Sequence, residues 1–102
     1  MPAYRLATPA KRDLVEVLEY LLENVGGRLA LSVESRLRSA FQMLARHPGA
    51  GHKRADLTSK PALFLTVGQY VIVYRIDSGL VLIVAVLHGS RDVKAILEQR
   101  PF

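Results

Sequence analysis

The sequence contains no cysteine. This absence excludes a disulfide scaffold, a zinc–thiolate site, an iron–sulfur cluster and a cysteine nucleophile. A chain without disulfides is compatible with the reducing cytoplasm. We therefore expect a cytoplasmic protein that is held together by an ordinary hydrophobic core.

Long apolar runs are also missing, and the longest extends only from Leu80 to Leu87. A membrane-spanning helix needs about 18 or more apolar residues, so the sequence predicts no membrane segment. Charged residues recur between Arg5 and Arg12, which is not the layout of a secretion signal.

Motifs for cofactors and metals are absent as well. The sequence has no P-loop, no GxGxxG and no GxSxG element. His47 and His52 lack further ligand residues around them, which argues against a metal site. We therefore expect neither a cofactor nor a metal.

The chain has enough apolar content for one small domain, because half of its 102 residues are hydrophobic. We treat residues 1–102 as that single domain. Its charge is uneven: residues 35–102 hold ten Lys+Arg and four Asp+Glu, whereas residues 1–34 hold four and five. This asymmetry favours an anionic partner, either nucleic acid or an acidic protein segment, although a solvated basic surface without a partner also explains it.

Two helices are predicted in the first half of the chain. Thr8-Pro9 resembles a helix start with a hydroxyl cap, and Gly26-Gly27 resembles a helix end. Between them, apolar residues at three- and four-residue spacing form one stripe: Leu14, Val17, Leu18, Leu21, Leu22 and Val25. A second amphipathic segment covers residues 28–46 and ends at His47-Pro48. The short link between the two segments predicts an αα-hairpin.

The second half of the chain changes to a strand pattern. Residues 62–67, 70–76 and 80–87 are rich in β-branched and aromatic residues and are separated by glycine-containing turns. Residues 4–7 predict a short edge strand, and Ser90 or Asp92 is placed to cap a short terminal helix. The order β-α-α-β-β-β with a short C-terminal helix predicts an α+β fold, in which the helical hairpin packs on one face of an antiparallel sheet.

The turns also predict a register, and the register assigns side chains to faces. A two-residue turn at Gly68-Gln69 pairs Leu65 with Ile72, and a three-residue link at 77–79 pairs Tyr74 with Leu82. The face turned away from the helices then carries Phe64, Thr66, Val71, Val73, Arg75, Val81, Ile83, Ala85 and Leu87. This face is too apolar for water, so we expect a partner chain or a second copy to cover it. The alternative is that the terminal helix covers the face unaided.

The ordered motifs resemble the RelE/ParE superfamily, the toxins of bacterial type II toxin–antitoxin pairs. The most specific pieces are Tyr70–Ile76, which reads YVIVYRI, and Val86–Asp92, which reads VLHGSRD. The resemblance covers nearly the whole chain and implies an antitoxin that wraps the toxin. RelE-like members resemble ribosome-dependent mRNA endonucleases, whereas ParE-like members are associated with inhibition of DNA gyrase.

Two departures favour the ParE-like branch. RelE-like nucleases tend to carry an arginine early in the strand after the hairpin, where this chain has Val71. They also tend to carry a tyrosine just past the last strand, where this chain has Lys94. Valine supplies neither the charge nor the proton that cleavage of RNA needs. The resemblance therefore implies a toxin that binds a target protein, with gyrase as the expected target and a cognate antitoxin as partner in a hetero-oligomer.

The candidate contacts for target or antitoxin lie on the outward face and at the end of the last strand: Phe64, Val71, Val73, Arg75, Val81, Ile83, His88 and Arg91. The alternative, a RelE-like nuclease acting on mRNA at the ribosome, would use Lys53, Arg54, Arg75, His88 and Arg91. His88 also fits a hydrogen-bonded structural role. A third class, an inert structural domain, stays open from the sequence.

Overall fold

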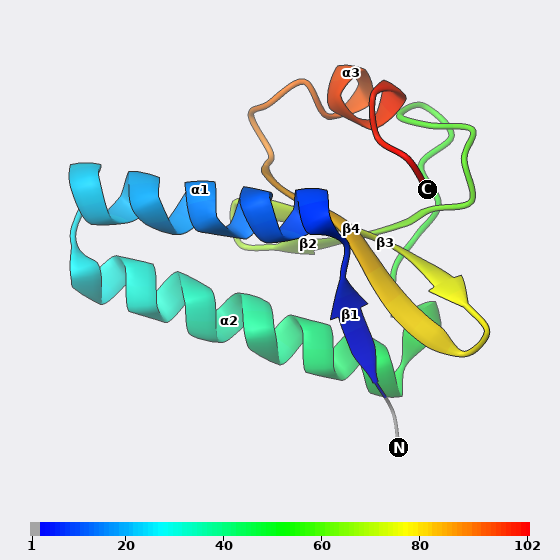
Figure 1. Cartoon of the computed structure of the whole chain (residues 1–102), viewed down its shortest axis with the longest axis horizontal. Coiled ribbons are helices and arrows are strands. Elements are labelled where there is room, and N and C mark those ends of the chain that lie inside the picture. Colours follow the sequence, from blue (N-terminus) through cyan, green and yellow to red (C-terminus); the bar gives the residue numbers. More distant parts are fainter. Residues whose placement is uncertain (1–2) are drawn as a thin grey trace.

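Two long helices lie on one face of a four-stranded sheet, and one short helix lies on the other (Figure 1). The computed structural model describes residues 3–102. The elements in chain order are β1 (Tyr4–Leu6), α1 (Thr8–Asn24), α2 (Gly27–Arg46), a 3₁₀ turn (Pro48–Ala50), β2 (Leu63–Val67), β3 (Tyr70–Asp77), β4 (Leu80–His88) and α3 (Val93–Glu98). The predicted α+β class and element order are confirmed.

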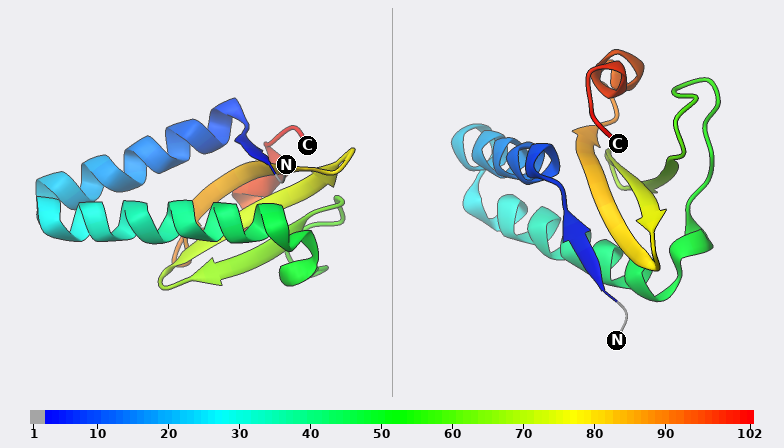
Figure 2. Two further views of the ribbon diagram at one scale, coloured as in Figure 1. Left: turned by 90° about the horizontal axis from the view of Figure 1, so that it is seen from below. Right: turned by 45° about the vertical axis from the view of Figure 1, so that its right-hand side comes forward.

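The sheet is mixed and not purely antiparallel as predicted. Its strand order is β1-β4-β3-β2, and β1 runs parallel to β4, with Arg5 opposite Leu82. The helical hairpin lies between β1 and the other strands in the sequence. In the sheet, β1 pairs with β4 and forms the edge opposite β2. Figure 2 shows α1 and α2 side by side across this sheet.

Both ends of α1 differ in detail from the prediction. Thr8 does not cap the helix, because Ala7 occupies the N-cap position and no side chain caps the first turn. At the other end α1 stops at Asn24, and Gly26 takes a φ of 146°, which favours glycine. α2 therefore starts at Gly27, one residue earlier than predicted.

The tip of the hairpin projects beyond the strands (Figure 1). Three residues of the predicted apolar stripes consequently lie in solvent: Leu22, Val25 and Leu29 are 58%, 59% and 44% exposed. The half of the hairpin over the sheet is buried as expected, through Leu14 and Leu21 of α1 and through residues of α2 such as Phe41. The tip thus provides apolar surface that the core does not use.

The predicted β3–β4 register was wrong. The turn contains two residues, because Ser78 and Gly79 both adopt positive φ, at 51° and 81°, and Asp77 pairs with Leu80. Positive φ at both central positions is the geometry of a type I′ hairpin turn. A bulge at Val73/Tyr74 then changes the register again. A one-residue shift moves side chains to the opposite face of a strand.

This shift reverses part of the predicted face assignment. Val81 and Ile83 were expected to point outward, but both face the helices and are fully buried. Leu82 and Val84 were expected under the helices, but they lie in the second core, on the outer face. The assignments for β2 and β3 are correct because the Gly68-Gln69 turn pairs Leu65 with Ile72 as predicted.

The chain itself covers the apolar part of the outer face of the sheet, so the expectation that a partner must cover it is wrong. Val73 is fully buried, and Phe64 is only 5% exposed. The cover consists of α3, through Val93 and Leu97, together with residues that the terminal-helix argument left out, such as Phe102. The terminal helix does not cover the face unaided, because the loop before β2 and the C-terminal Phe102 complete the cover.

Tyr74 joins the sheet to the 3₁₀ turn through its buried phenol. The phenol donates a hydrogen bond to the Pro48 carbonyl at 2.6 Å and accepts one from the Gly51 N–H at 2.9 Å. Burial raises the pKa of Tyr74 above its ordinary value, and the hydrogen bond from Gly51 opposes that rise. The folded chain therefore holds this proton more tightly than the unfolded chain does.

We expect this proton to make stability depend on pH in the alkaline range. The contribution of Tyr74 is complete below the unfolded pKa of about 10 and is lost as pH rises above it, since the unfolded state then binds fewer protons. Urea denaturation at about pH 8 and about pH 11 should show a smaller decrease in unfolding free energy for Tyr74→Phe than for wild type. Equal decreases would contradict this role of the phenol.

Candidate functional site: the groove beside the helical hairpin

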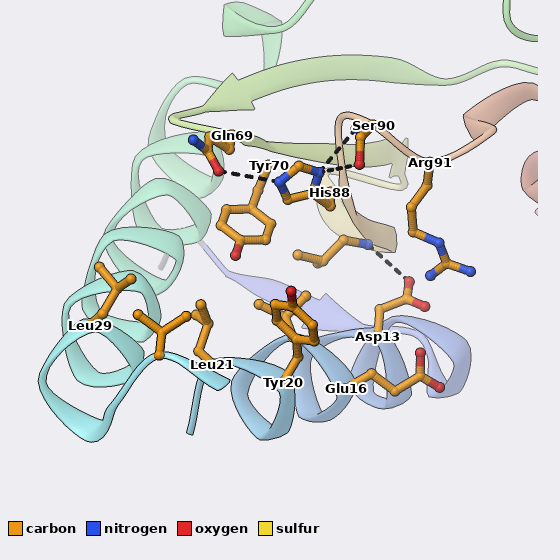
Figure 3. Close-up of a pocket in the computed structure, with 13 residues that line it drawn as sticks. Asp13, Glu16, Tyr20, Leu21, Leu29, Gln69, Tyr70, His88, Ser90 and Arg91 are labelled. Atoms are coloured by element: carbon orange, nitrogen blue, oxygen red, sulfur yellow. Dashed lines mark hydrogen bonds between the residues drawn. The ribbon is translucent and has the colours of Figure 1, made fainter. Parts of the chain in front are cut away.

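A groove of about 520 Å³ runs between α1, the start of α2 and the ends of β3 and β4 (Figure 3). Its apolar lining comes mainly from the hairpin and the sheet floor: Val17, Tyr20, Leu21, Val25, Leu29, Tyr70 and Val86. Its polar lining is Asp13, Glu16, Gln69, His88, Ser90 and Arg91. A smaller hollow of about 240 Å³ shares Leu21, Leu29, Gln69 and Tyr70 with it and ends at Arg36. The groove is therefore an elongated apolar channel with charged ends.

Two tyrosines lie across the groove from one another. Tyr20 of α1 is 63% exposed, and Tyr70 at the start of β3 is half-buried. Figure 3 shows their phenol groups pointing toward each other. Burial raises the pKa of Tyr70, and the nearby Tyr20 phenol raises it further. Partly exposed aromatic rings are the residue type that protein interfaces use as anchors.

His88 closes one end of the groove and is fully engaged by its own chain. Its Nδ1 accepts a hydrogen bond from the Ser90 N–H at 3.1 Å and lies 2.7 Å from the Ser90 hydroxyl. Because a backbone N–H can only donate, Nδ1 carries no proton, and Nε2 donates to Gln69 Oε1 at 3.2 Å. The ring also packs edge-on against Tyr70, with centroids 5.4 Å apart. This arrangement fits the structural role anticipated for His88, and it fixes the shape of the groove.

A buried ion pair supports the floor of the groove. Asp13 of α1 binds Arg100 through two contacts, at 2.6 and 2.8 Å, and accepts the Val86 N–H at 3.0 Å. Arg100 also donates to the Val84 carbonyl at 2.9 Å. These two backbone groups lie on the edge of β4 beyond the end of β1, where no strand pairs with them. Asp13 and Arg100 therefore replace the missing strand.

The structure does not bring all the residues of the nuclease alternative together: His88 and Arg91 line the groove, but Arg75 and Arg54 do not. His88 lies opposite Tyr70, whereas Arg75 lies opposite Leu82, six residues further along β4 and thus about 20 Å away. Arg54 lies in the loop before β2, and its guanidinium is bound to Asp56 at 2.7 Å. That contact keeps the pKa of the Asp56 carboxyl below its ordinary value.

The structure divides the predicted contact residues into two groups. Phe64, Val73, Val81 and Ile83 are buried inside the chain, so their predicted exposure is wrong. The other four, Val71, Arg75, His88 and Arg91, keep accessible surface, and only His88 and Arg91 line the groove. The predicted cap is confirmed, because Asp92 Oδ1 accepts the Ala95 N–H at 3.1 Å.

The groove residues of the hairpin were not predicted from the sequence. Val25 and Leu29 continue the apolar stripes of the two helices, so their spacing is that of core residues. The available signal was position, because Tyr20, Val25 and Leu29 all lie close to the Gly26-Gly27 link between the helices. Apolar residues at the tip of a helical hairpin have no strand to cover when that tip projects beyond the sheet.

Two solved structures with this fold are toxin–antitoxin systems. The chromosomal ParDE system from P. aeruginosa superposes with a TM-score of 0.73 at 16% sequence identity, over 86% of this chain and 96% of that chain. The RelBE2 toxin–antitoxin complex from Mycobacterium tuberculosis superposes with a TM-score of 0.57 at 26% identity, over 86% and 99%. No curated protein sequence matches. The fold is thus that of the RelE/ParE superfamily.

The family profile described as "ParE toxin of type II toxin-antitoxin system, parDE" matches residues 4–93. The chain belongs to this family of type II toxins, as the resemblance implied. Within residues 3–102, no helix is both long enough and apolar enough to cross a membrane.

Proposed function

We propose that this chain is a growth-inhibiting toxin that acts in the cytoplasm by binding a target protein, with DNA gyrase as that target. A cognate antitoxin neutralises it by occupying the groove beside the hairpin. The proposal builds on membership of the ParE toxin family. It differs from the nuclease alternative because the toxin forms a protein complex and breaks no covalent bond.

The observation that carries the proposal is a largely apolar groove in a chain whose candidate catalytic groups do not all lie around one point. Cleavage of RNA by 2′-hydroxyl attack needs a base, an acid and a cation around one phosphate. In this chain, Arg75 and His88 are about 20 Å apart, and Val71 occupies the position where a RelE-like arginine is expected. The groove offers exposed aromatic and aliphatic side chains, which favour binding of a protein segment.

The test measures supercoiling by purified gyrase with and without the toxin. We expect the toxin to inhibit supercoiling and to leave mRNA intact in a translating extract. Adding the protein encoded by the neighbouring upstream reading frame, if it is short and acidic, should restore gyrase activity. Cleavage of mRNA in the extract, with supercoiling unaffected, would refute the proposal in favour of the nuclease alternative.

Groove substitutions should weaken antitoxin binding without unfolding the toxin. Tyr20→Ala removes an exposed ring from the groove wall, and we expect at least about 30-fold weaker binding, which corresponds to about 2 kcal/mol. Leu29→Ala should weaken binding in the same direction. Isothermal titration with the purified upstream-encoded protein measures both.

Leu31→Ala is the matched control for Leu29→Ala. Leu31 lies on the same helix and is 69% exposed, but it does not line the groove. We expect Leu31→Ala to change antitoxin affinity by less than about threefold, as is usual for residues outside an interface. Equal losses for the two leucine variants would show that the antitoxin binds elsewhere.

A further inference from the structure

A second surface, remote from the groove, carries arginines that the fold does not use. The sheet register places Arg5 of β1 and Arg75 of β3 on either side of Leu82 of β4. Neighbouring strands are about 4.8 Å apart, so the two Cα atoms lie about 10 Å from each other on one face. Tyr4 contacts Phe41 on the helical side, and side chains alternate along a strand, so Arg5 points to the outer face.

This arginine row lies at the end of the outer face that α3 leaves open. β4 starts at the β3–β4 turn and leads at its other end toward α3, so the turn is the end remote from that helix (Figure 2). Arg5 is exposed, and no carboxylate lies within ion-pair distance of it in residues 3–102. Among the residues that the structure describes, Asp77 is the one carboxylate in ion-pair range of Arg75, at a long 3.6 Å.

Arg75 is also incompletely satisfied in the free chain. Its Nε–H is buried and has no hydrogen-bond acceptor. A buried donor without a partner is unfavourable, so the guanidinium gains when it turns toward an external anion. Arg75 therefore has donor capacity that its own chain leaves unsatisfied, and an external anion can use it when the guanidinium turns outward.

We propose that Arg5 and Arg75 bind phosphate groups of a nucleic-acid backbone. Guanidinium groups match the geometry of phosphate oxygens and bind them through paired hydrogen bonds. The chain as a whole carries a formal net charge of +5, which also favours an anionic ligand. No base-reading element accompanies the row, so binding depends on the backbone and not on sequence. The site lies across the sheet from the groove, so an antitoxin that occupies only the groove would leave it accessible.

The test is a salt titration of binding to a labelled short DNA duplex and to a labelled single-stranded RNA, followed by fluorescence anisotropy. Each phosphate contact contributes about 0.9 to the slope of log K against log salt for duplex DNA and about 0.7 for single strands. We expect the Arg5→Ala/Arg75→Gln double variant to lose about 1.8 from the DNA slope or about 1.4 from the RNA slope. The nucleic acid whose binding is weakened more by the double variant is the one whose phosphates the two arginines bind.

Arg28→Ala/Arg46→Ala is the matched control, because it removes the same charge from exposed positions of the helical layer that take part in no ion pair within residues 3–102. We expect its slope to equal that of wild type. Equal losses for both double variants would overturn the proposal in favour of diffuse charge attraction. The proposal would also be overturned if no nucleic acid bound at about 50 mM salt, or if the chain bound polyglutamate but no nucleic acid.

The Arg5→Ala single variant keeps the test valid if the double variant fails to fold, since Arg5 is exposed. We expect this single variant to lose half as much of the slope as the double variant loses. The Tyr20→Ala groove variant should bind nucleic acid like wild type, so failure of this proposal and failure of the groove proposal are distinguishable.

Discussion

Replacing Arg100 with alanine should lower the free energy of unfolding by about 3–5 kcal/mol. The Arg100 side chain is 15% exposed and its partner Asp13 is 5% exposed, so the substitution leaves a carboxylate buried without its counter-charge. The Val84 carbonyl loses its donor at the same time. Urea denaturation followed by circular dichroism measures the change, and Asp13→Ala should have an effect of similar size.

The exposed pair Arg38–Glu34 provides the control for this prediction. Its atoms are 3.3 Å apart on the surface of α2, and the arginine side chain is 52% exposed. Arg38→Ala should therefore cost no more than about 0.5 kcal/mol, because solvent screens such pairs. If Arg100→Ala were as mild as Arg38→Ala, the ion pair would not be the element that closes the edge of β4.

The consequence of the Arg100 substitution should extend to the groove. Asp13 lines the groove and holds the Val86 N–H, so a change in its position alters the floor that a partner contacts. We expect Arg100→Ala to weaken antitoxin binding even under conditions in which the variant is still folded. Arg100 itself lies outside the groove, so such a loss would measure its effect through Asp13.

Gly51→Ala should destabilise the fold by about 3 kcal/mol, through overpacking and the loss of a buried hydrogen bond. A Cβ atom at Gly51 would lie 2.7 Å from the Tyr74 hydroxyl and 2.9 Å from the Phe64 carbonyl. The first of these is the group that binds the Gly51 N–H, and the second is backbone of β2. Neither can move without separating the 3₁₀ turn from the sheet. Urea denaturation monitored by tyrosine fluorescence measures the change.

Gly49→Ala is the control, since Gly49 lies in the same turn but a Cβ atom there would contact nothing within 4 Å. Its φ is not in the positive range, so alanine fits the backbone. We expect Gly49→Ala to change stability by no more than about 0.5 kcal/mol, or to stabilise slightly by restricting the unfolded chain. A similar loss at both glycines would mean that the turn tolerates no side chain at all, irrespective of Tyr74.

The helices and strands were predictable because their signals are local. The three- and four-residue spacing of apolar residues gave α1 and α2 to within one or two residues, and His47-Pro48 marked the end of α2 correctly. The Gly68-Gln69 turn gave the β2–β3 register. The capping role of Asp92 also depends only on residues next to it in the sequence. Each of these features follows from interactions within a few residues along the chain.

The register of β4 was not predictable in the same way. A two-residue turn and a three-residue link both fit the Asp77-Ser78-Gly79 stretch, and the choice depends on the φ of Ser78. The bulge near Val84 has no distinct sequence pattern, because every residue around it is apolar. The turn type and the bulge are both decided by which side chains fill the cores on the two faces of the sheet. For this reason Val81 and Ile83 were assigned to the wrong face.

The amino-acid order by itself thus determined the fold class, the helical hairpin, most strand limits and the membership of a toxin superfamily. Only the tertiary structure decided which surface is free. It buried the outer face beneath α3 and Phe102. It also left the hairpin tip uncovered and joined Asp13 to Arg100 across 87 positions of sequence. The physical reason is that exposure depends on how far each element extends over its neighbour, and local periodicity carries no information about that length.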